Sequence, residues 1–204
     1  MQNRYLILFI CYLFVNELIF KGTKESILIV VKNILFYRKE FAKQETPSYF
    51  INYINKNLNS IINYNKNYVL VDFGCGDGST LRKLKICKKK IGIEIDKTIY
   101  NLALSKNKNN NIKFINDDIC NYNFNKNTIL YMYEPLWLCK DNLSIYNKLF
   151  KKINKSNKHI YIIYLTGFTK QLQEKHFQNY NFKLLHKYKH GSILLNRYIY
   201  IYSN

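Results

Sequence analysis

An apolar run that ends in alternating glycines constrains this chain more than any other feature. Residues 69–78 read V-L-V-D-F-G-C-G-D-G, so the apolar stretch 68–71 leads into Asp72 and then into Gly74, Gly76 and Gly78. Apolar residues followed directly by glycines are typical of a parallel strand that ends in a tight turn. Glycine is required where the backbone takes a positive φ or approaches a ligand closely. Because ligands of doubly wound α/β sheets bind beyond the carboxyl ends of the strands, the segment predicts a small-molecule site.

The spacing of the glycines decides which molecule is expected. A nicotinamide fingerprint, G-x-G-x-x-G, would need its third glycine at position 79, where the chain has Ser79. A carboxylate at Asp72 would also repel a pyrophosphate. An acidic residue ahead of G-x-G-x-G resembles the first motif of the class I S-adenosylmethionine-dependent methyltransferases. That cofactor carries a sulfonium and an ammonium group and no phosphate, so a neighbouring carboxylate is electrostatically favourable. The alternative is a glycine-rich turn in an unrelated α/β protein.

Later segments match the same family in order. A helix is predicted from Ser79 to Ile86, and a second strand over 90–95 carries Glu94, twenty-two residues after Asp72. An acidic residue at about this distance suits hydrogen bonding to ribose hydroxyls. Helical spacing over 96–104 predicts one apolar face formed by Ile99, Leu102 and Ala103.

The second half of the chain predicts the rest of the sheet. Strands are expected over 112–115, 128–133 and 159–165, followed by a helix over 170–180. Two aromatic and β-branched runs, 182–188 and 192–202, are separated by His190 and Gly191 and indicate a hairpin.

The resemblance covers roughly residues 47–204. It implies a Rossmann-like, mostly parallel twisted sheet of about seven strands with helices on both faces, an antiparallel C-terminal hairpin, and additional N-terminal helices. We therefore divide the chain into an N-terminal helical segment, 1–45, and a methyltransferase domain, 46–204.

The resemblance also implies which residues bind S-adenosylmethionine. The acidic side chain of Asp72 lies beside the amino-acid end of the cofactor, Glu94 binds the ribose, and Asp118 receives the adenine amino group. The full set of expected cofactor-binding residues is Asp72, Phe73, Gly74, Cys75, Gly76, Asp77, Gly78, Glu94, Ile95, Asp117, Asp118 and Ile119.

The methyl acceptor is expected where the fourth strand ends. Residues 134–137 read E-P-L-W and resemble the [D/N/S]-P-P-[Y/F/W] motif of methyltransferases that act on planar or amide nitrogen. Glutamate and Leu136 depart from that motif, which places nucleic-acid amino methylation in doubt. Tyr133, Glu134 and Trp137 are the candidate catalytic residues. In the alternative interpretation, proline ends the strand and Trp137 packs in the core.

Several acceptors remain open on this basis. A nitrogen of a protein side chain, such as lysine, is the first choice, because the chain has no evident inserted nucleic-acid-binding domain. A small molecule or lipid and RNA or DNA are the alternatives, as is a catalytically inactive module that binds the cofactor. Clustering of the lysines on one face around Trp137 would favour nucleic acid.

The amino-acid composition further limits the partners, metal sites and cellular compartment that are expected. The net charge of +19 is typical of proteins that bind nucleic acid or anionic membranes. Lysine, asparagine, isoleucine and tyrosine are all abundant together, however, which an A/T-biased coding sequence also produces. Five cysteines show no C-x-x-C pair and no histidine at metal-ligand spacing, so no metal site is expected. Their odd number favours reduced thiols and an intracellular, reducing compartment.

The first 45 residues differ from the rest of the chain. Residues 5–15 are an unbroken apolar run, interrupted at Asn16 and Glu17, and a second apolar stretch spans 27–37. Both are short for a spanning helix, which needs about 20 apolar residues. Residues 5–37 are therefore expected either to associate with a membrane or to cap the catalytic domain.

Overall fold

The computed structural model describes residues 46–107, 111–133, 143–166, 176–190 and 197–204. The segment 1–45, with its expected membrane association, lies outside the described residues, so the two-domain division stays a prediction. Among the described residues, no helix has the length and apolar character needed to cross a membrane.

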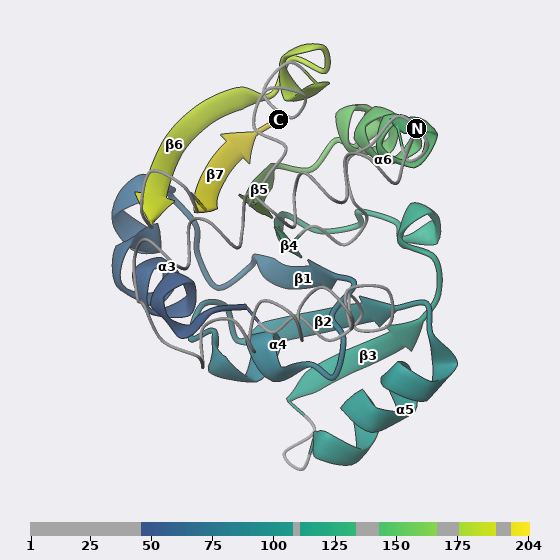
Figure 1. Ribbon diagram of the computed structural model, residues 1–204. Helices are drawn as coiled ribbons and strands as arrows, with labels where there is room; N and C mark the ends of the chain where they lie inside the picture. Colours follow the sequence, from purple (N-terminus) through teal and green to yellow (C-terminus); the bar gives the residue numbers. More distant parts are fainter. Residues whose placement is uncertain (1–45, 108–110, 134–142, 167–175, 191–196) are drawn as a thin grey trace, which may run out of the picture. The chain divides into compact units, whose positions relative to one another are not determined.

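The described part is built on one seven-stranded sheet with the strand order β3-β2-β1-β4-β5-β7-β6 (Figure 1). The five parallel strands are β1 (Val69–Phe73), β2 (Lys89–Glu94), β3 (Ile112–Asn116), β4 (Thr128–Tyr133) and β5 (Ile160–Thr166). The C-terminal strands β6 (Lys183–His190) and β7 (Arg197–Ser203) form an antiparallel pair, and β7 also runs antiparallel to β5. The predicted sheet and its C-terminal hairpin are thereby confirmed.

Helices cover both faces of the sheet, α3 and α4 on one side and α6 on the other (Figure 1). Their bounds are Ser48–Ile61 for α3, Ser79–Lys83 for α4, Lys97–Lys106 for α5 and Leu143–Lys155 for α6, and a short 3-10 helix, η2, spans Ile119–Asn121. Alternation along β1 explains the two layers. Leu70 faces the core beneath α3 and α4, whereas Val69, Val71 and Phe73 face the core beneath α6.

Two helix predictions need correction. The helix that starts at Ser79 ends at Lys83, and Leu84 is already extended, so the predicted end at Ile86 is wrong. In α5 Ala103 is buried, but Leu102 is 42% exposed. The buried stripe of α5 instead combines Ala103 with Tyr100, one turn earlier, because residues three and four apart share a helix face. The helix expected over 170–180 lies mostly outside the described residues.

Strand β2 holds the end of α4 through a lysine. Lys90 Nζ donates hydrogen bonds to Leu81 O and Leu84 O, at 2.9 and 2.5 Å. The last carbonyls of a helix have no partners within the helix, and a cation there is also favoured by the helix dipole. Burial lowers the pKa of Lys90. The strand that carries Glu94 at its far end therefore also secures the helix that follows the glycine turn.

Candidate functional site

The glycine turn adopts the backbone conformation that its sequence predicts. Gly74, Gly76 and Gly78 have φ values of 71°, 56° and 77°. Most side chains avoid this left-handed region because Cβ crowds the backbone, so glycine is the favoured residue. The amides of Gly74 and Cys75 both donate to Ile93 O, at 2.9 and 3.0 Å, which ties the turn to the end of β2.

Close packing gives Gly78 a second constraint. A Cβ added at Gly78 would lie 2.5 Å from Cζ of Phe114, and a Cβ added at Gly92 would lie 2.7 Å from Phe114 and from Cys75 Sγ. These distances are too short for carbon contacts. The close approach at Gly78 is therefore to an aromatic ring of β3, which seats the start of α4 against the sheet.

Asp72 is an acidic side chain within the core. It is 3% exposed and lies beside Tyr131, its register partner on β4. Burial, and secondly repulsion from the nearby Glu94 carboxylate, together raise the pKa of the Asp72 carboxyl to about 8. Burial and the Asp72 charge also raise the pKa of Tyr131 well above its usual range. A cation beside Asp72 would stabilise its ionised form.

Three hydroxyl groups form a buried network next to this carboxyl. The Tyr131 hydroxyl is 2.6 Å from Thr46 Oγ1, and Thr80 Oγ1 donates to Thr46 Oγ1 at 3.0 Å. Thr46 precedes α3 and Thr80 lies in α4, so the network joins both helices to β4. These three residues are not among the predicted site residues, although the alternation of Tyr131 with Tyr133 along β4 could have indicated Tyr131.

Glu94 is oriented by the backbone on both sides. Its Oε2 accepts a hydrogen bond from Gly76 N at 3.1 Å, and its Oε1 accepts one from Asp96 N at 3.0 Å. Each carboxylate oxygen has a second lone pair, so both oxygens can still accept from a ligand hydroxyl. The next residue, Ile95, is 69% exposed. An apolar surface therefore lies directly beside a fixed hydrogen-bond acceptor.

The end of β3 is linked to the end of β2. Asn116 Nδ2 donates to Glu94 O and to Ile95 O, at 2.8 and 3.0 Å. Asp118 caps η2 by accepting from Cys120 N at 2.8 Å, and Asp117 Oδ1 accepts from Asp118 N at 2.7 Å. Both aspartates line a cavity of about 230 Å³. Ile119 packs at the margin of the core beneath α6.

Three of the predicted cofactor-binding residues have side chains that are buried or hydrogen-bonded within the protein. Phe73 is 1% exposed and packs against Tyr122 and Phe124, so only its backbone is available. Burial raises the pKa of the Cys75 thiol, with Asp72 as the next cause, and the thiol stays protonated.

The third, Asp77, has a charge that is already neutralised. Its carboxylate accepts from Lys106 Nζ at 2.6 Å and from Ser79 N at 2.9 Å. Burial opposes ionisation, but these hydrogen bonds outweigh it and lower the pKa of Asp77. This arrangement fixes the turn and leaves little charge for a ligand.

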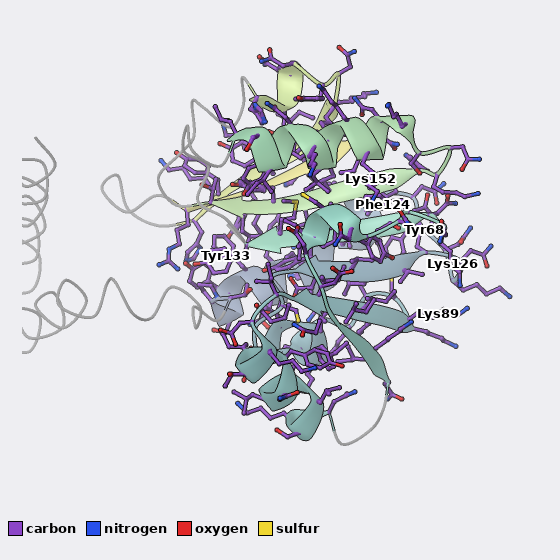
Figure 2. The ribbon with its side chains drawn as sticks, turned by 90° about the vertical axis from the view of Figure 1, so that its right-hand side faces the viewer. Tyr68, Lys89, Phe124, Lys126, Tyr133 and Lys152 are labelled. Carbon is purple, nitrogen blue, oxygen red and sulfur yellow. The ribbon has the colours of Figure 1, made fainter. Side chains whose placement is uncertain are left out.

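Of the candidate catalytic residues, Tyr133 is described and Glu134 and Trp137 lie outside the described residues. Tyr133 is half-buried at the carboxyl end of β4, and Arg197 Nη1 donates to its hydroxyl at 3.3 Å. Figure 2 shows Tyr133 at the end of the sheet opposite Lys89 and Lys126. The acceptor side of the site thus has an aromatic hydroxyl oriented by an arginine from β7.

Acidic side chains are concentrated at this one edge. Every acidic side chain in the described part of the chain lies within the last two residues of β1, β2 or β3 or at most four residues beyond them: Asp72, Asp77, Glu94, Asp96, Asp117 and Asp118. Of these six acidic side chains, Asp77 forms ion pairs, with Lys106 and Arg82. No group of three His, Cys, Asp or Glu residues among those described could hold a metal ion. This edge is therefore acidic in a protein whose net charge is +19.

No protein-family model matches the chain, and no curated protein sequence matches it. Solved structures do match. A candidate RNA methyltransferase from Pyrococcus horikoshii has a TM-score of 0.60 and 18% identity, covering 81% of this chain and 89% of its own. Magnesium protoporphyrin IX methyltransferase from Synechocystis PCC 6803, with S-adenosylmethionine bound, has a TM-score of 0.59 and 11% identity, covering 83% of this chain and 90% of its own. The N-methyltransferase NodS from Bradyrhizobium japonicum WM9, with S-adenosylhomocysteine bound, has a TM-score of 0.53 and 13% identity, covering 68% of this chain and 78% of its own.

The fold is therefore that of the class I S-adenosylmethionine-dependent methyltransferases, as the glycine motif predicted. At these identities the likeness concerns the fold, and the acceptors named for the three proteins are their own. Those names include RNA and a magnesium porphyrin, and none is a protein side chain.

Proposed function

We propose that the protein binds S-adenosylmethionine at the carboxyl edge of β1, β2 and β3 and transfers its methyl group to an acceptor beside Tyr133. The gathering of all the described carboxylates at this edge carries the proposal. A ligand that brings positive charge would stabilise the ionised form of Asp72, which is buried without a cationic partner among the described residues. The ammonium and sulfonium groups of S-adenosylmethionine carry such charge.

The other groups at the edge suit the remaining parts of the cofactor. Glu94 can accept from ribose hydroxyls with the lone pairs that the backbone amides leave free. Ile95 offers an exposed apolar surface for the adenine ring, and we assign Asp118, which follows β3, to the adenine amino group. The side chains of Phe73, Cys75 and Asp77 have no direct part in this arrangement.

Methyl transfer from this cofactor then requires mainly that the acceptor is aligned with the methyl carbon. S-adenosylmethionine, when bound, supplies a methyl group on a positively charged sulfur, which is already a good leaving group. Positioning an acceptor in line with such a carbon can lower a barrier by about 7–11 kcal/mol. Tyr133, with its hydroxyl held by Arg197, is placed to orient the acceptor, and we retain Glu134 and Trp137 as candidates for the same role. A lysine side chain as acceptor has no support from the structural neighbours.

Calorimetry with the full-length chain tests the cofactor site. We expect saturable binding of S-adenosylmethionine, weakened at least ten-fold by Asp72→Asn and by Glu94→Gln, since a hydrogen bond to a charged group contributes about 1.5–3 kcal/mol. Asp77→Asn is the matched control, because its charge is already neutralised by Lys106 and its effect should be much smaller. Absence of saturable binding in the unmodified protein would instead support an inactive module with this fold.

Methyl transfer needs a separate assay. Incubation of the protein with a cell extract and cofactor labelled at the methyl group, followed by separation of protein, nucleic acid and lipid, identifies the acceptor class. We expect Glu134→Ala to retain cofactor binding and to lose turnover. Equal loss of binding in Asp72→Ala and Glu134→Ala would contradict this division of roles.

A further inference from the structure

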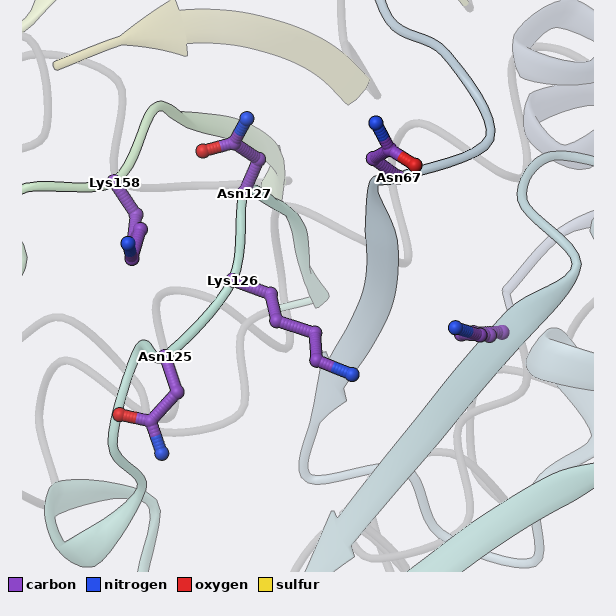
Figure 3. A pocket seen from close by; sticks show the side chains of 6 residues that line it. Asn67, Asn125, Lys126, Asn127 and Lys158 are labelled. Atoms are coloured by element: carbon purple, nitrogen blue, oxygen red, sulfur yellow. The ribbon is translucent and has the colours of Figure 1, made fainter.

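A basic hollow lies at the edge of the sheet opposite the candidate cofactor site. It has a volume of about 330 Å³ and is lined by Asn67, Lys89, Asn125, Lys126, Asn127 and Lys158 (Figure 3). Each of these residues begins a strand or lies at most three residues before one, so the hollow lies at the amino ends of β1, β2, β4 and β5. In Figure 3 the side chain of Lys126 extends across it. Three ammonium groups and three amides therefore share one concave surface.

Helix α6 extends this basic surface towards the other edge. Lys148, Lys151 and Lys155 are exposed and recur at intervals of three and four residues, which places them on one helix face. The opposite face is buried and consists of Tyr146, Leu149, Phe150 and Ile153. The helix follows the carboxyl end of β4 and leads to the amino end of β5, so its exposed face joins the two edges (Figure 2).

We call these lysines the basic track. Its members are Lys89, Lys126, Lys148, Lys151, Lys155 and Lys158. None of them forms an ion pair or a side-chain hydrogen bond with any described residue. Like charges three or four residues apart destabilise a helix, and α6 contains no acidic residue to offset them. Biased composition can account for the number of lysines, but it does not explain why the described carboxylates all lie at the opposite edge of the sheet.

We infer that the basic track binds the phosphodiester backbone of a nucleic acid. The regular positive charges along a helix and into a hollow match a linear chain of phosphates. An anionic membrane is a poorer match, because membrane-bound surfaces also insert apolar side chains. The large exposed hydrophobic residues among those described are Ile95, Leu102, Leu104 and Leu184, and none belongs to the track.

The composition of the track also indicates how the nucleic acid would be recognised. Lysines contact phosphates, which position a nucleic acid without reading its sequence. The hollow and the exposed face of α6 present no aromatic side chain on which a base could stack. Binding should therefore be independent of sequence and steeply dependent on salt. This inference does not rest on methyl transfer, and Asp72→Asn should leave nucleic-acid binding unchanged.

Fluorescence anisotropy with the full-length chain and labelled single-stranded RNA and DNA of mixed sequence tests the inference. Six phosphate contacts predict a slope of about −4 for the logarithm of affinity against the logarithm of salt concentration on single strands. The triple variant Lys126→Gln, Lys155→Gln, Lys158→Gln should reduce that slope by about 2 and weaken binding at about 0.1 M salt roughly 100-fold.

A second triple variant controls for net charge. Lys56, Lys85 and Lys189 are exposed, lie off the track, and form no side-chain ion pair or hydrogen bond with described residues. Their replacement by glutamine should weaken binding less than five-fold, as expected for charges that lie outside the track and are screened by salt. Equal losses in the two triple variants would overturn the inference, as would no binding in the unmodified protein. Loss of binding to vesicles rich in phosphatidylserine in the track variant, without loss of nucleic-acid binding, would make the track a membrane surface instead.

Discussion

Replacing the buried carboxyl of Asp72 should stabilise the protein while weakening its proposed function. Burial raises the pKa of this group from its ordinary 3.8 to about 8. The folded state therefore retains a proton that the unfolded chain has released between about pH 4 and pH 8. Where the folded state binds more protons than the unfolded state, the free energy of unfolding falls as the pH rises. Asp72→Asn removes this dependence, since an amide does not titrate.

The size of the effect follows from the pKa. Each pH unit between the two pKa values costs about 1.36 kcal/mol of stability. Because pH 7 lies about three units above the unfolded pKa, the cost there is roughly 4 kcal/mol. Relaxation around the carboxyl and its hydroxyl neighbours reduces this, and we expect Asp72→Asn to be about 2–4 kcal/mol more stable at pH 7. Near pH 4 the two proteins should be equally stable.

Urea unfolding followed by far-ultraviolet circular dichroism at pH 4, 5, 6, 7 and 8 measures this difference. Asp77→Asn provides a control of opposite sign. The pKa of Asp77 is lowered, so its ionised form adds stability that is present above the unfolded pKa and lost as the pH falls through the folded value. Parallel stability curves for Asp72→Asn and the unmodified protein would refute the view that Asp72 is a buried, uncompensated acid.

Three further outcomes follow from the same site. If a cationic cofactor holds Asp72 ionised, the affinity of the protein for the cofactor should fall up to about ten-fold for each pH unit below 8. Calorimetry in two buffers of different ionisation enthalpy should then detect the release of a proton from Asp72 on binding. Gly78→Ala should destabilise the fold by about 1–2 kcal/mol from its positive φ and by about 1–3 kcal/mol from the clash with Phe114. In urea titrations Phe114→Leu should recover only the second part, whereas full recovery would show that backbone strain is absent. Lys90→Met should cost about 1–3 kcal/mol in the same assay, because two buried carbonyls lose their donor, and an unchanged midpoint would contradict the role of Lys90 at the end of α4.

Strands β1, β4 and β5 could be predicted because each is a short, mostly apolar run that is buried along its length. Strand β4 spans Thr128–Tyr133 as predicted, and the predicted start of β2 differs by one residue. The glycines and acidic residues at the strand ends also predict a site at the carboxyl edge, since parallel strands all deliver their carboxyl ends there.

Helices α3 and α6 were missed, although both have a clear helical pattern. In α3 the buried residues Phe50, Ile54 and Leu58 recur every four residues, and α6 shows the same spacing. Other features have no signal in a single sequence. The neutralisation of Asp77 depends on Lys106, which is distant in sequence, and the packing of Phe114 against Gly78 depends on how β3 and the glycine turn meet.

Strand β2 supports the glycine turn and the end of its helix at once. Glu94 accepts the amide of Gly76 at one end of the strand, and Lys90 binds the last carbonyls of α4 near the other. The turn is thus preorganised before any ligand arrives, and little conformational entropy remains to be lost on binding. Association with a small cofactor should accordingly proceed in a single fast phase, without a slow ordering step.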